Sequence, residues 1–444
     1  MRESVEITRQ APVAGHYQVV VCGGGPAGLT AAISAARAGR RTALIERLGF
    51  LGGSATAGLV VPMSGFFFQG QRVVGGIAWE LASRLIAQGA AQVEMPKGHI
   101  SFHPEYYKLT AQEMVEESGV DVYAHALLSG CLVRDGRLSH VVMESKNGTE
   151  ALSGQCFIDA TGEADLCRMA AAPMEKGHEN LQPMSLCFLL EGVDLSTELM
   201  RDCVHHAGKD GKPSCNQTIR DYLSGCVERG QLEQFGGPWF NALVRGKAVA
   251  VNVTRRPGNA CCRASLQAAE EKLRRDMFTI VELLRRRYPE FRRCEIVASG
   301  VSVGVREAVR IQGITTVTGA DLLAERSYPC PVARCAHPMD LHHSHSAAQD
   351  LIPLTGPAYI PHTALLPQGM ANLIAAGRCI SCDAQAYASL RVQATMMATG
   401  ESAGVMAALY CRHGGSLADL DPELIHRNLL QRGVLLPAYP QTAG

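Results

Sequence analysis

The sequence predicts an α/β fold: a Rossmann-like dinucleotide-binding domain on a parallel sheet, joined to a second domain of mixed α+β structure. The first observation is a pattern of strand, glycine turn, helix and strand over residues 17–46. The second is two further short apolar strands, 156–160 and 373–376, and a helix of small residues over 394–410. The third is a change after about residue 173, where strand-like and helix-like segments alternate. Together these patterns are typical of an α/β domain followed by an α+β domain.

The first pattern has the context that a phosphate-binding turn requires. Residues 17–22 are apolar and rich in β-branched side chains, as in a strand buried on both faces. A G-x-G-x-x-G turn and an Ala-rich helix over 27–38 follow, and their first residues are predicted to approach a pyrophosphate: Gly23, Gly25, Pro26, Ala27 and Gly28.

An acidic residue then narrows the choice of dinucleotide. Glu46 follows the second predicted strand, 42–45, where a carboxylate binds a ribose hydroxyl. The same carboxylate disfavours a 2′-phosphate, so NADP is not expected here. FAD and NAD remain on this evidence alone.

Composition and charge exclude several classes of protein. The formal net charge of the 444 residues is zero, which gives no overall attraction to nucleic acid or to an anionic membrane. Sixteen dispersed cysteines in so long a chain indicate a reducing compartment rather than a disulfide scaffold. Residues 1–15 lack the apolar core of a signal peptide, and the apolar run 57–68 is too short to span a bilayer. We therefore expect a cytoplasmic protein that has no nucleic acid or membrane partner.

Periodicity and turn residues place the other elements. Helices are predicted over 75–88, 104–118, 196–206, 215–228 and 263–288. Strands are predicted over 120–124, 125–133, 138–144, 184–191, 248–253 and 295–303, with a hairpin at the Arg134-Asp-Gly-Arg137 turn. The basic face of helix 263–288 is interpreted as a solvated surface rather than a partner site.

Several blocks in order resemble the glutathione-reductase-like flavoproteins with two dinucleotide-binding domains, and more closely the bacterial FAD-dependent oxidoreductase family. The matching blocks are Gly23 to Gly28, the run 46–58 from Glu-Arg to Thr-Ala-Gly, Ile-Asp-Ala-Thr-Gly-Glu-Ala-Asp at 158–165, Ser-Val-Gly-Val-Arg-Glu at 302–307, Ala-Gly-Arg-Cys-Ile-Ser at 376–381, and Ser-Leu-Arg-Val-Gln-Ala-Thr at 389–395. The resemblance runs from about residue 17 to 410, and it implies FAD as the cofactor.

The resemblance also implies a discontinuous layout. Residues 16–172 and 363–411 would together form the FAD-binding domain, and residues 173–362 would form a substrate domain that covers the flavin. Residues 412–444 would add a C-terminal helix and tail.

The family pattern assigns further contacts to FAD. Arg47 would lie near the adenosine and Leu128 beside the adenine. The helix that begins near Ala394 would direct its positive end at the flavin. The remaining residues that the resemblance places along the pyrophosphate, the ribityl chain or the flavin are Gly53, Ser54, Thr56, Thr161, Gly162, Asp165, Gly377, Arg378, Arg391 and Thr395.

Arginines and histidines are the candidates for substrate chemistry. Arg306 and Arg310, four residues apart, are expected on one face of a helix, where they clamp a carboxylate or else pair with Glu307. Residues 326–362 are expected to form a long ordered loop, and in the family its 338–342 part reaches the flavin. His342 is therefore the acid–base candidate, with a solvent-exposed histidine as the alternative.

His362 is a further catalytic candidate. The His362-Thr363 pair departs from the Tyr-Arg type of sequence that the family carries there, which suggests a different substrate.

Two groups of cysteines and histidines are interpreted as non-catalytic. Cys379 and Cys382 form a C-x-x-C, but a chance pair is favoured over a redox dithiol. A zinc set is also disfavoured because its spacing fits no standard structural site; its members would be Cys330, Cys335, His337, His342 and His345. No metal is expected.

The chain has no second G-x-G-x-x-G after Glu46, so a built-in nicotinamide domain is not expected. The leading hypothesis is an FAD-dependent oxidoreductase that transfers a hydride between a small organic substrate, carboxylate-bearing if the arginines bind it, and the flavin. Electrons then exchange with an external donor or acceptor. The alternatives are a flavoprotein whose FAD is structural or non-redox, and an electron-carrying subunit. The sequence leaves the substrate and any homo-oligomer open.

Overall fold

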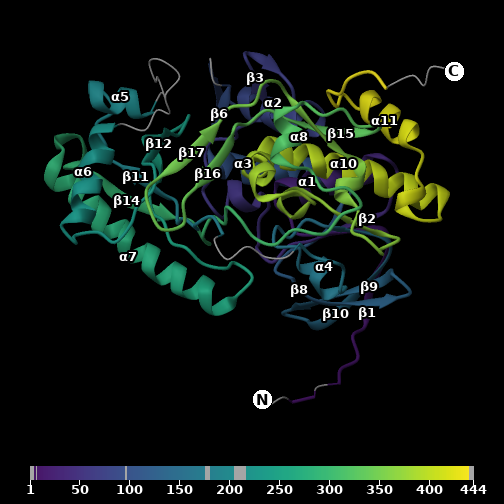
Figure 1. The fold of residues 1–444 in the computed structure, drawn as a ribbon. Helices are drawn as coiled ribbons and strands as arrows, with labels where there is room; N and C mark the ends of the chain where they lie inside the picture. Colours follow the sequence, from purple (N-terminus) through teal and green to yellow (C-terminus); the bar gives the residue numbers. More distant parts are fainter. Residues whose placement is uncertain (1–4, 7, 96–97, 176–180, 205–216, 440–444) are drawn as a thin grey trace.

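The computed structural model describes residues 5–6, 8–95, 98–175, 181–204 and 217–439. These residues form a mixed α/β fold around a sheet that contains parallel strands (Figure 1). The α/β class predicted from the sequence is confirmed.

The largest sheet brings distant parts of the chain to one edge. Its order is β7-β2-β1-β10-β9-β8, and β19 also pairs with β10. Since β1 runs parallel to β2 and β10, and β10 parallel to β19, the carboxyl ends of these strands coincide, with Cys22 opposite Asp159 and Asp159 opposite Ala375. The strands are β1 (Val13–Cys22), β2 (Thr42–Ile45), β7 (Asp121–Tyr123), β8 (Leu127–Arg134), β9 (Arg137–Ser145), β10 (Gly148–Asp159) and β19 (Leu373–Ala375).

The predicted hairpin between β8 and β9 is confirmed. Its two central residues, Asp135 and Gly136, both have positive φ, as a two-residue hairpin turn of the right twist requires. Strand β10 is longer than predicted because its first half pairs with β9 and its second half with β19.

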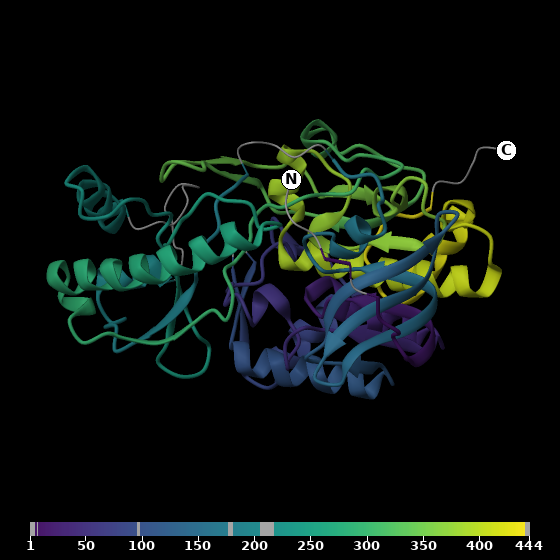
Figure 2. The same cartoon turned by 90° about the horizontal axis from the view of Figure 1, so that it is seen from below.

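A second, antiparallel sheet has its own apolar core. Its order is β12-β13-β11-β14, and Phe188, Phe240 and Phe291 are buried in the cluster between this sheet and its helices. Figure 2 shows the long helix α7 along this part of the molecule. The elements are β11 (Phe188–Glu191), β12 (Trp239–Ala242), β13 (Val249–Asn252), β14 (Glu295–Ser299), α5 (Glu198–Val204), α6 (Gln217–Glu228) and α7 (Arg263–Arg287). The predicted helix ends at 205–206 and 215–216 lie outside the described residues.

The prediction of a long loop over residues 326–362 is wrong. The segment contains four short strands that pair as β15 (Pro331–Cys335) with β18 (Ala358–Pro361), and β16 (Met339–His342) with β17 (Gln349–Ile352). The prolines that suggested a loop stand at strand ends, where a missing N–H is tolerated. Val332, Ala333 and Ile360 are buried in the same apolar cluster as Leu29 and Met397, which explains why this segment is ordered.

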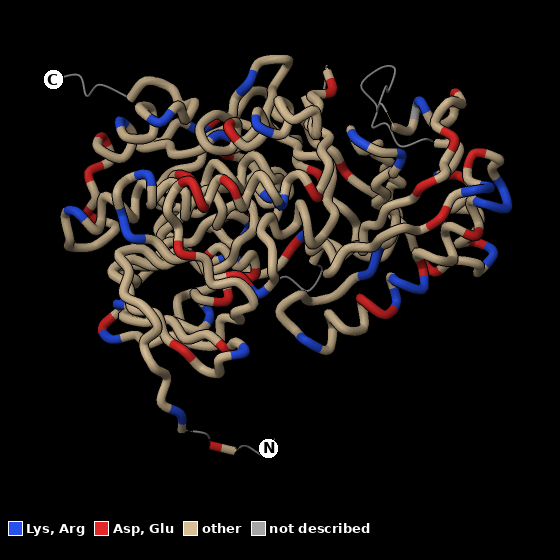
Figure 3. The backbone as a smooth tube through the Cα atoms, turned by 180° about the vertical axis from the view of Figure 1, so that it is seen from behind, with Lys and Arg blue, Asp and Glu red and all other residues tan. Residues whose placement is uncertain are grey.

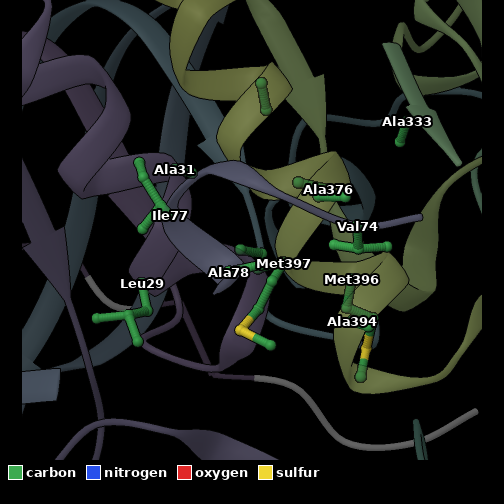
Figure 4. Packing of buried hydrophobic residues seen from close by; sticks show 14 of the residues in the cluster. Leu29, Ala31, Val74, Ile77, Ala78, Ala333, Ala376, Ala394, Met396 and Met397 are labelled. Carbon is green, nitrogen blue, oxygen red and sulfur yellow. The ribbon is translucent and has the colours of Figure 1, made fainter. Parts of the chain in front are cut away.

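The helix α10 (Gln393–His413) packs directly on α1 (Pro26–Arg37) at the centre of the molecule. Residues 393–410 of α10 are all buried, and Figure 4 shows Met396, Met397 and Ala394 in the same apolar cluster as Leu29 and Ala31 of α1. A Cβ on Gly400 would overlap the carbonyl oxygen of Ala27. The two helices are therefore in backbone contact.

Two hydroxyl groups connect the same helices. Thr30 Oγ1 donates to the carbonyl of Met397 at 2.7 Å, and Ser34 Oγ donates to the carbonyl of Glu401 at 2.8 Å. Both side chains are buried, so these hydrogen bonds fix how far α10 can slide along α1.

Shorter elements complete the fold. The helices predicted at 75–88 and 104–118 are α2 (Gly76–Ala87) and α3 (Pro104–Glu117), and α11 (Pro422–Gln431) lies in the C-terminal segment. The others are β3 (Phe67–Phe68), β4 (Gln71–Arg72), β5 (Ala91–Glu94), β6 (His99–Phe102), α4 (Asp165–Met169), α8 (Gly319–Leu323), α9 (Ala384–Leu390), and the 3-10 turns η1 (Gly53–Ala55), η3 (Pro289–Phe291), η4 (His362–Leu365), η5 (Gly377–Cys379) and η6 (Leu417–Asp419). The division into domains at residues 172, 362 and 411 stays a prediction.

Charged residues of both signs are distributed along the backbone, as Figure 3 shows. Among the described residues, no helix has the length and apolar character needed to cross a membrane.

We predict that Gly400→Ala destabilises the protein by about 1–3 kcal/mol, because the new methyl group forces α10 away from α1. Gly225→Ala is the matched control, since Gly225 also lies in a helix, α6, but its Cβ would meet only the mobile end of Arg229. That variant should be neutral or more stable, because alanine is the better helix former. Urea unfolding measures the free energy of unfolding of both variants. Equal changes of that free energy in the two variants would contradict the close packing of α10 on α1.

Candidate functional site

The N-terminus of α1 forms one wall of a cavity of about 560 Å³. Gly25 is the N-cap of this helix, no side chain caps it, and Pro26 occupies the first turn. The first-turn N–H groups of an uncapped helix lack intrahelical acceptors and carry a partial positive charge. This end of α1 is therefore suited to a pyrophosphate.

Glu46 lies at the carboxyl end of β2 and is held from both sides. Its Oε2 accepts the N–H of Gly24 at 2.7 Å, and its Oε1 accepts the N–H of Leu48 at 2.9 Å. Each carboxylate oxygen keeps a second lone pair, and the side chain lines the cavity. This is the arrangement needed to accept hydrogen bonds from ribose hydroxyls.

The structure gathers most of the predicted cofactor residues on this cavity. Those that line it are Gly23, Gly25, Pro26, Ala27, Glu46, Arg47, Gly53, Ser54, Thr161, Gly162, Asp165, Gly377 and Arg378. They come from four separate stretches of the chain, which the parallel sheet and the contact of α1 with α10 bring together.

Other predicted cofactor residues do not line this cavity. Gly28 lies beneath it, where a Cβ would overlap the carbonyl of Gly23. Thr56 is buried and donates to the carbonyl of Leu51, and Leu128 packs on the core beside β9. Thr395 is in the first turn of α10, and its buried hydroxyl has no partner among the described residues.

The loop after β10 is held by a buried carboxylate. Asp159 accepts the N–H and the hydroxyl of Thr161 and the N–H of Cys167. Thr161 in turn accepts the N–H of Asp165 at 2.8 Å. Burial raises the pKa of Asp159, and the three donors oppose that rise.

A second cavity of about 480 Å³ adjoins the first. The two cavities share five wall residues: Ser54, Gly304, Val305, Arg378 and Met396. Arg378 spans this boundary, with its guanidinium donating to the carbonyl of Val305 and to the carboxylate of Glu163. The hydroxyl of Ser54, buried at the same boundary, has no partner among the described residues.

The prediction that Arg306 and Arg310 lie on one face of a helix is wrong. Residues 304–310 are irregular rather than helical, so Arg306 and Arg310 do not share a helical face. Arg310 is buried and pairs with Glu307 at 2.9 Å, whereas Arg306 lines the second cavity. Of the two, only Arg306 is placed to meet a substrate.

His342 lies at the end of β16 on the wall of the second cavity, with both ring nitrogens occupied. Arg255 Nη2 donates to Nδ1 at 2.7 Å, which places the ring proton on Nε2, and that N–H donates to Asp340 at 3.0 Å. Burial and the charge of Arg306 lower the pKa of His342 to about 3. This geometry disfavours the predicted acid–base role.

Asp340 connects His342 to Arg391. Its carboxylate accepts from His342, from Arg391 at 3.3 Å and from Gln349 at 2.6 Å. Despite burial, these partners keep the pKa of Asp340 below its usual value. Arg391, predicted beside the flavin, is thus a wall residue of the second cavity.

The remaining candidates lie elsewhere. His362 is buried in η4, outside the lining of either cavity, and its catalytic role stays a prediction. Cys379 and Cys382 are buried free thiols, and burial raises the pKa of Cys382 to about 12. Within the described ranges, no cluster of three or more His, Cys, Asp or Glu could hold a metal ion.

Several site residues were missed from the sequence. Arg255, Asn252 and Asp340 carry no motif. The pairing of β13 and β16 with their neighbours places Asn252 and Asp340 on the wall of the second cavity, and Arg255 lies behind that wall, bonded to His342. The first turns of α7 also reach the first cavity, through Arg263 and Glu270. The basic face of this helix did not indicate, from the sequence, that its first turns line a cavity.

The fold and the first cavity define a dinucleotide-binding protein of the Rossmann type. The chain belongs to the FAD dependent oxidoreductase family, whose model matches residues 18–429. FAD is therefore the cofactor and the protein is an FAD-dependent oxidoreductase, as the resemblance implied.

Other similarities are more limited. A soluble pyridine nucleotide transhydrogenase of Marinomonas sp. (strain MWYL1) is 61% identical over 41 residues, which is 9% of each chain. A geranylgeranyl bacteriochlorophyll reductase-like structure from Thermoplasma acidophilum aligns with a TM-score of 0.48 and 13% identity, over 94% of this chain and 83% of that one. A flavin-dependent brominase aligns with the same TM-score and identity, over 93% and 83%. At these values the likenesses do not bear on the substrate.

We predict that His342 is neutral, with its proton on Nε2, from about pH 5 to pH 9. Because burial lowers its folded pKa below the unfolded value, its contribution to stability is complete above about pH 6.5 and is lost as the pH falls toward 3. Nitrogen NMR of histidine-labelled protein, with His342→Asn to assign the signal, measures this directly. A His342 titration midpoint between about pH 6 and 7 would contradict the network.

Proposed function

We propose that this oxidoreductase transfers a hydride between a small organic substrate in the second cavity and FAD, and exchanges electrons with an external donor or acceptor. The observation that carries the proposal is the common wall of the two cavities. A molecule in the second cavity would lie directly beside the part of the cofactor that reaches Ser54, Arg378 and Met396. When bound, FAD supplies the two-electron redox chemistry.

The residues of this chain contribute binding, orientation and exclusion of water. Asp340, His342 and Arg391 form a fixed polar wall, because every charged group among them has a partner. In this proposal His342 is a positioning residue that holds Asp340 against Arg391. The uncapped N-terminus of α10 begins at Val392 and Gln393, and both residues line the same cavity.

The need for an external electron carrier is inferred from the sequence and not from the cavity. The chain has one Rossmann-type fingerprint, at Gly23 to Gly28, and FAD occupies that kind of site. A nicotinamide, oxygen, quinone or protein carrier would therefore have to approach from outside. The direction of the reaction is open in this proposal.

Anaerobic mixing of the FAD-loaded protein with a panel of small organic acids, alcohols and amines tests the proposal. At least one compound should bleach the oxidised flavin band. Turnover without bleaching would instead indicate a structural or non-redox FAD. Activity of the isolated chain with an artificial electron acceptor would exclude the electron-carrying subunit.

A pair of variants locates the substrate. Leu351→Trp narrows the second cavity and should slow flavin reduction about tenfold or more while FAD stays bound. Leu430→Trp is the control, because Leu430 is equally exposed, at 40%, but lines neither cavity. Equal rates of reduction in the two variants would place the substrate elsewhere.

A further inference from the structure

Arg306 is a partly buried cation whose hydrogen-bond partners among the described residues are all neutral. Its Nη1 donates to the carbonyl of Pro183 at 2.8 Å and to Ser185 Oγ at 2.6 Å, and its Nη2 donates to Asn252 Oδ1 at 3.2 Å. A guanidinium has five N–H groups. Two of them, including the Nε–H, have no acceptor among the described residues, and Arg306 lies on the wall of the second cavity.

The surroundings of Arg306 carry an excess of positive charge. Asp340 is the one carboxylate that lines this cavity among the described residues, and it is already bonded to Arg391 and His342. Arg255, behind His342, donates only to the carbonyls of Ser346 and Ala348 and to the neutral imidazole.

Three guanidiniums thus face one carboxylate in a buried region. Burial, together with the repulsion of neighbouring arginines, lowers the pKa of Arg306 to about 10 and that of Arg255 to about 9. Buried cations without a counter-ion are costly, and an anion in the cavity would remove that cost.

The rest of the cavity wall limits what the anion can be attached to. Much of it is apolar, and the apolar side chains come from four parts of the chain: Val60, Val61, Trp239, Leu351, Val392 and Met396. Arg391 differs from Arg306 because the Asp340 carboxylate already offsets its charge, and Gln182 and the Asp340 carbonyl accept two more of its N–H groups. The cavity therefore offers one place for a negative charge and an apolar space beside it.

We propose that the substrate is a monocarboxylate with an apolar or aromatic body, and that Arg306 binds its carboxylate through the two free N–H groups. Ser185 and Asn252 hold the guanidinium in the plane that this contact requires. The inference rests on the proposed function, because it names the substrate class of the same cavity. It replaces the clamp of two arginines expected from the sequence by a single anchor.

Binding to the FAD-loaded protein tests the inference without turnover. Isothermal calorimetry and thermal shift are measured with benzoate, phenylacetate and hexanoate, with benzamide as the neutral isostere of benzoate, and with succinate as a dicarboxylate. At least one monocarboxylate should bind at least about tenfold more tightly than benzamide and succinate.

Asn252→Asp supplies the sharpest variant. It keeps the size of the side chain but places a carboxylate on Arg306, and it should weaken monocarboxylate binding about ten- to a hundredfold. Arg306→Gln should do the same. Arg245→Gln is the control, since this exposed arginine lines neither cavity, and it should bind as the wild type does.

The outcomes separate the two proposals. Monocarboxylate binding that Asn252→Asp leaves unchanged, or no monocarboxylate bound more tightly than benzamide, would overturn the anchor. Flavin reduction by an uncharged compound, unaffected by Asn252→Asp, would overturn the anchor and leave the proposed function standing. If carboxylates bind as expected but no compound bleaches the flavin, the anchor stands and the proposed function is overturned.

Discussion

The contact between α1 and α10 is the constraint on which the rest of this structure depends. Gly400 lets the backbones touch, and the hydroxyls of Thr30 and Ser34 donate across the contact to carbonyls of α10. Two helices with larger residues at the contact would be held apart by their side chains, as most packed helices are. Because the axes are so close, the uncapped N-terminus of each helix reaches the same pair of adjoining cavities. The first turn of α1 thereby lines the first cavity and the first turn of α10 lines the second.

The second constraint is electrostatic. Three arginines line the second cavity, and hydrogen bonds hold each in place: neutral groups hold Arg306, Asp340 and Gln182 hold Arg391, and Glu163 and the carbonyl of Val305 hold Arg378. Fixed dipoles and charges of this kind need no reorganisation during a reaction. Neutral His342 fits this account better than a proton donor would, since its two hydrogen bonds hold Asp340 and Arg255 in place.

Local sequence patterns predicted the elements around the first cavity well and the elements around the second cavity poorly. The strand–turn–helix at 17–37 and the acid at 46 depend on neighbouring residues, so periodicity and glycine spacing were sufficient. The segment 326–362 was mistaken for a loop because its strands are short and their burial comes from α10, which is distant in the sequence. Arg306 and Arg310 were misplaced for a related reason: their spacing is helical, but contacts with residues distant in the sequence, such as the β-bridge of Ser185 with Gly304, hold the segment in a non-helical conformation. Asn252 and Arg255 had no local signal at all.

The absorbance spectrum and FAD content of the purified protein test the central claim most directly, namely that both ends of the chain form one FAD site. The account predicts the visible bands of oxidised flavin, with FAD and protein in equal amounts, either as purified or after FAD is added. A colourless protein that folds but does not bind added FAD would contradict it.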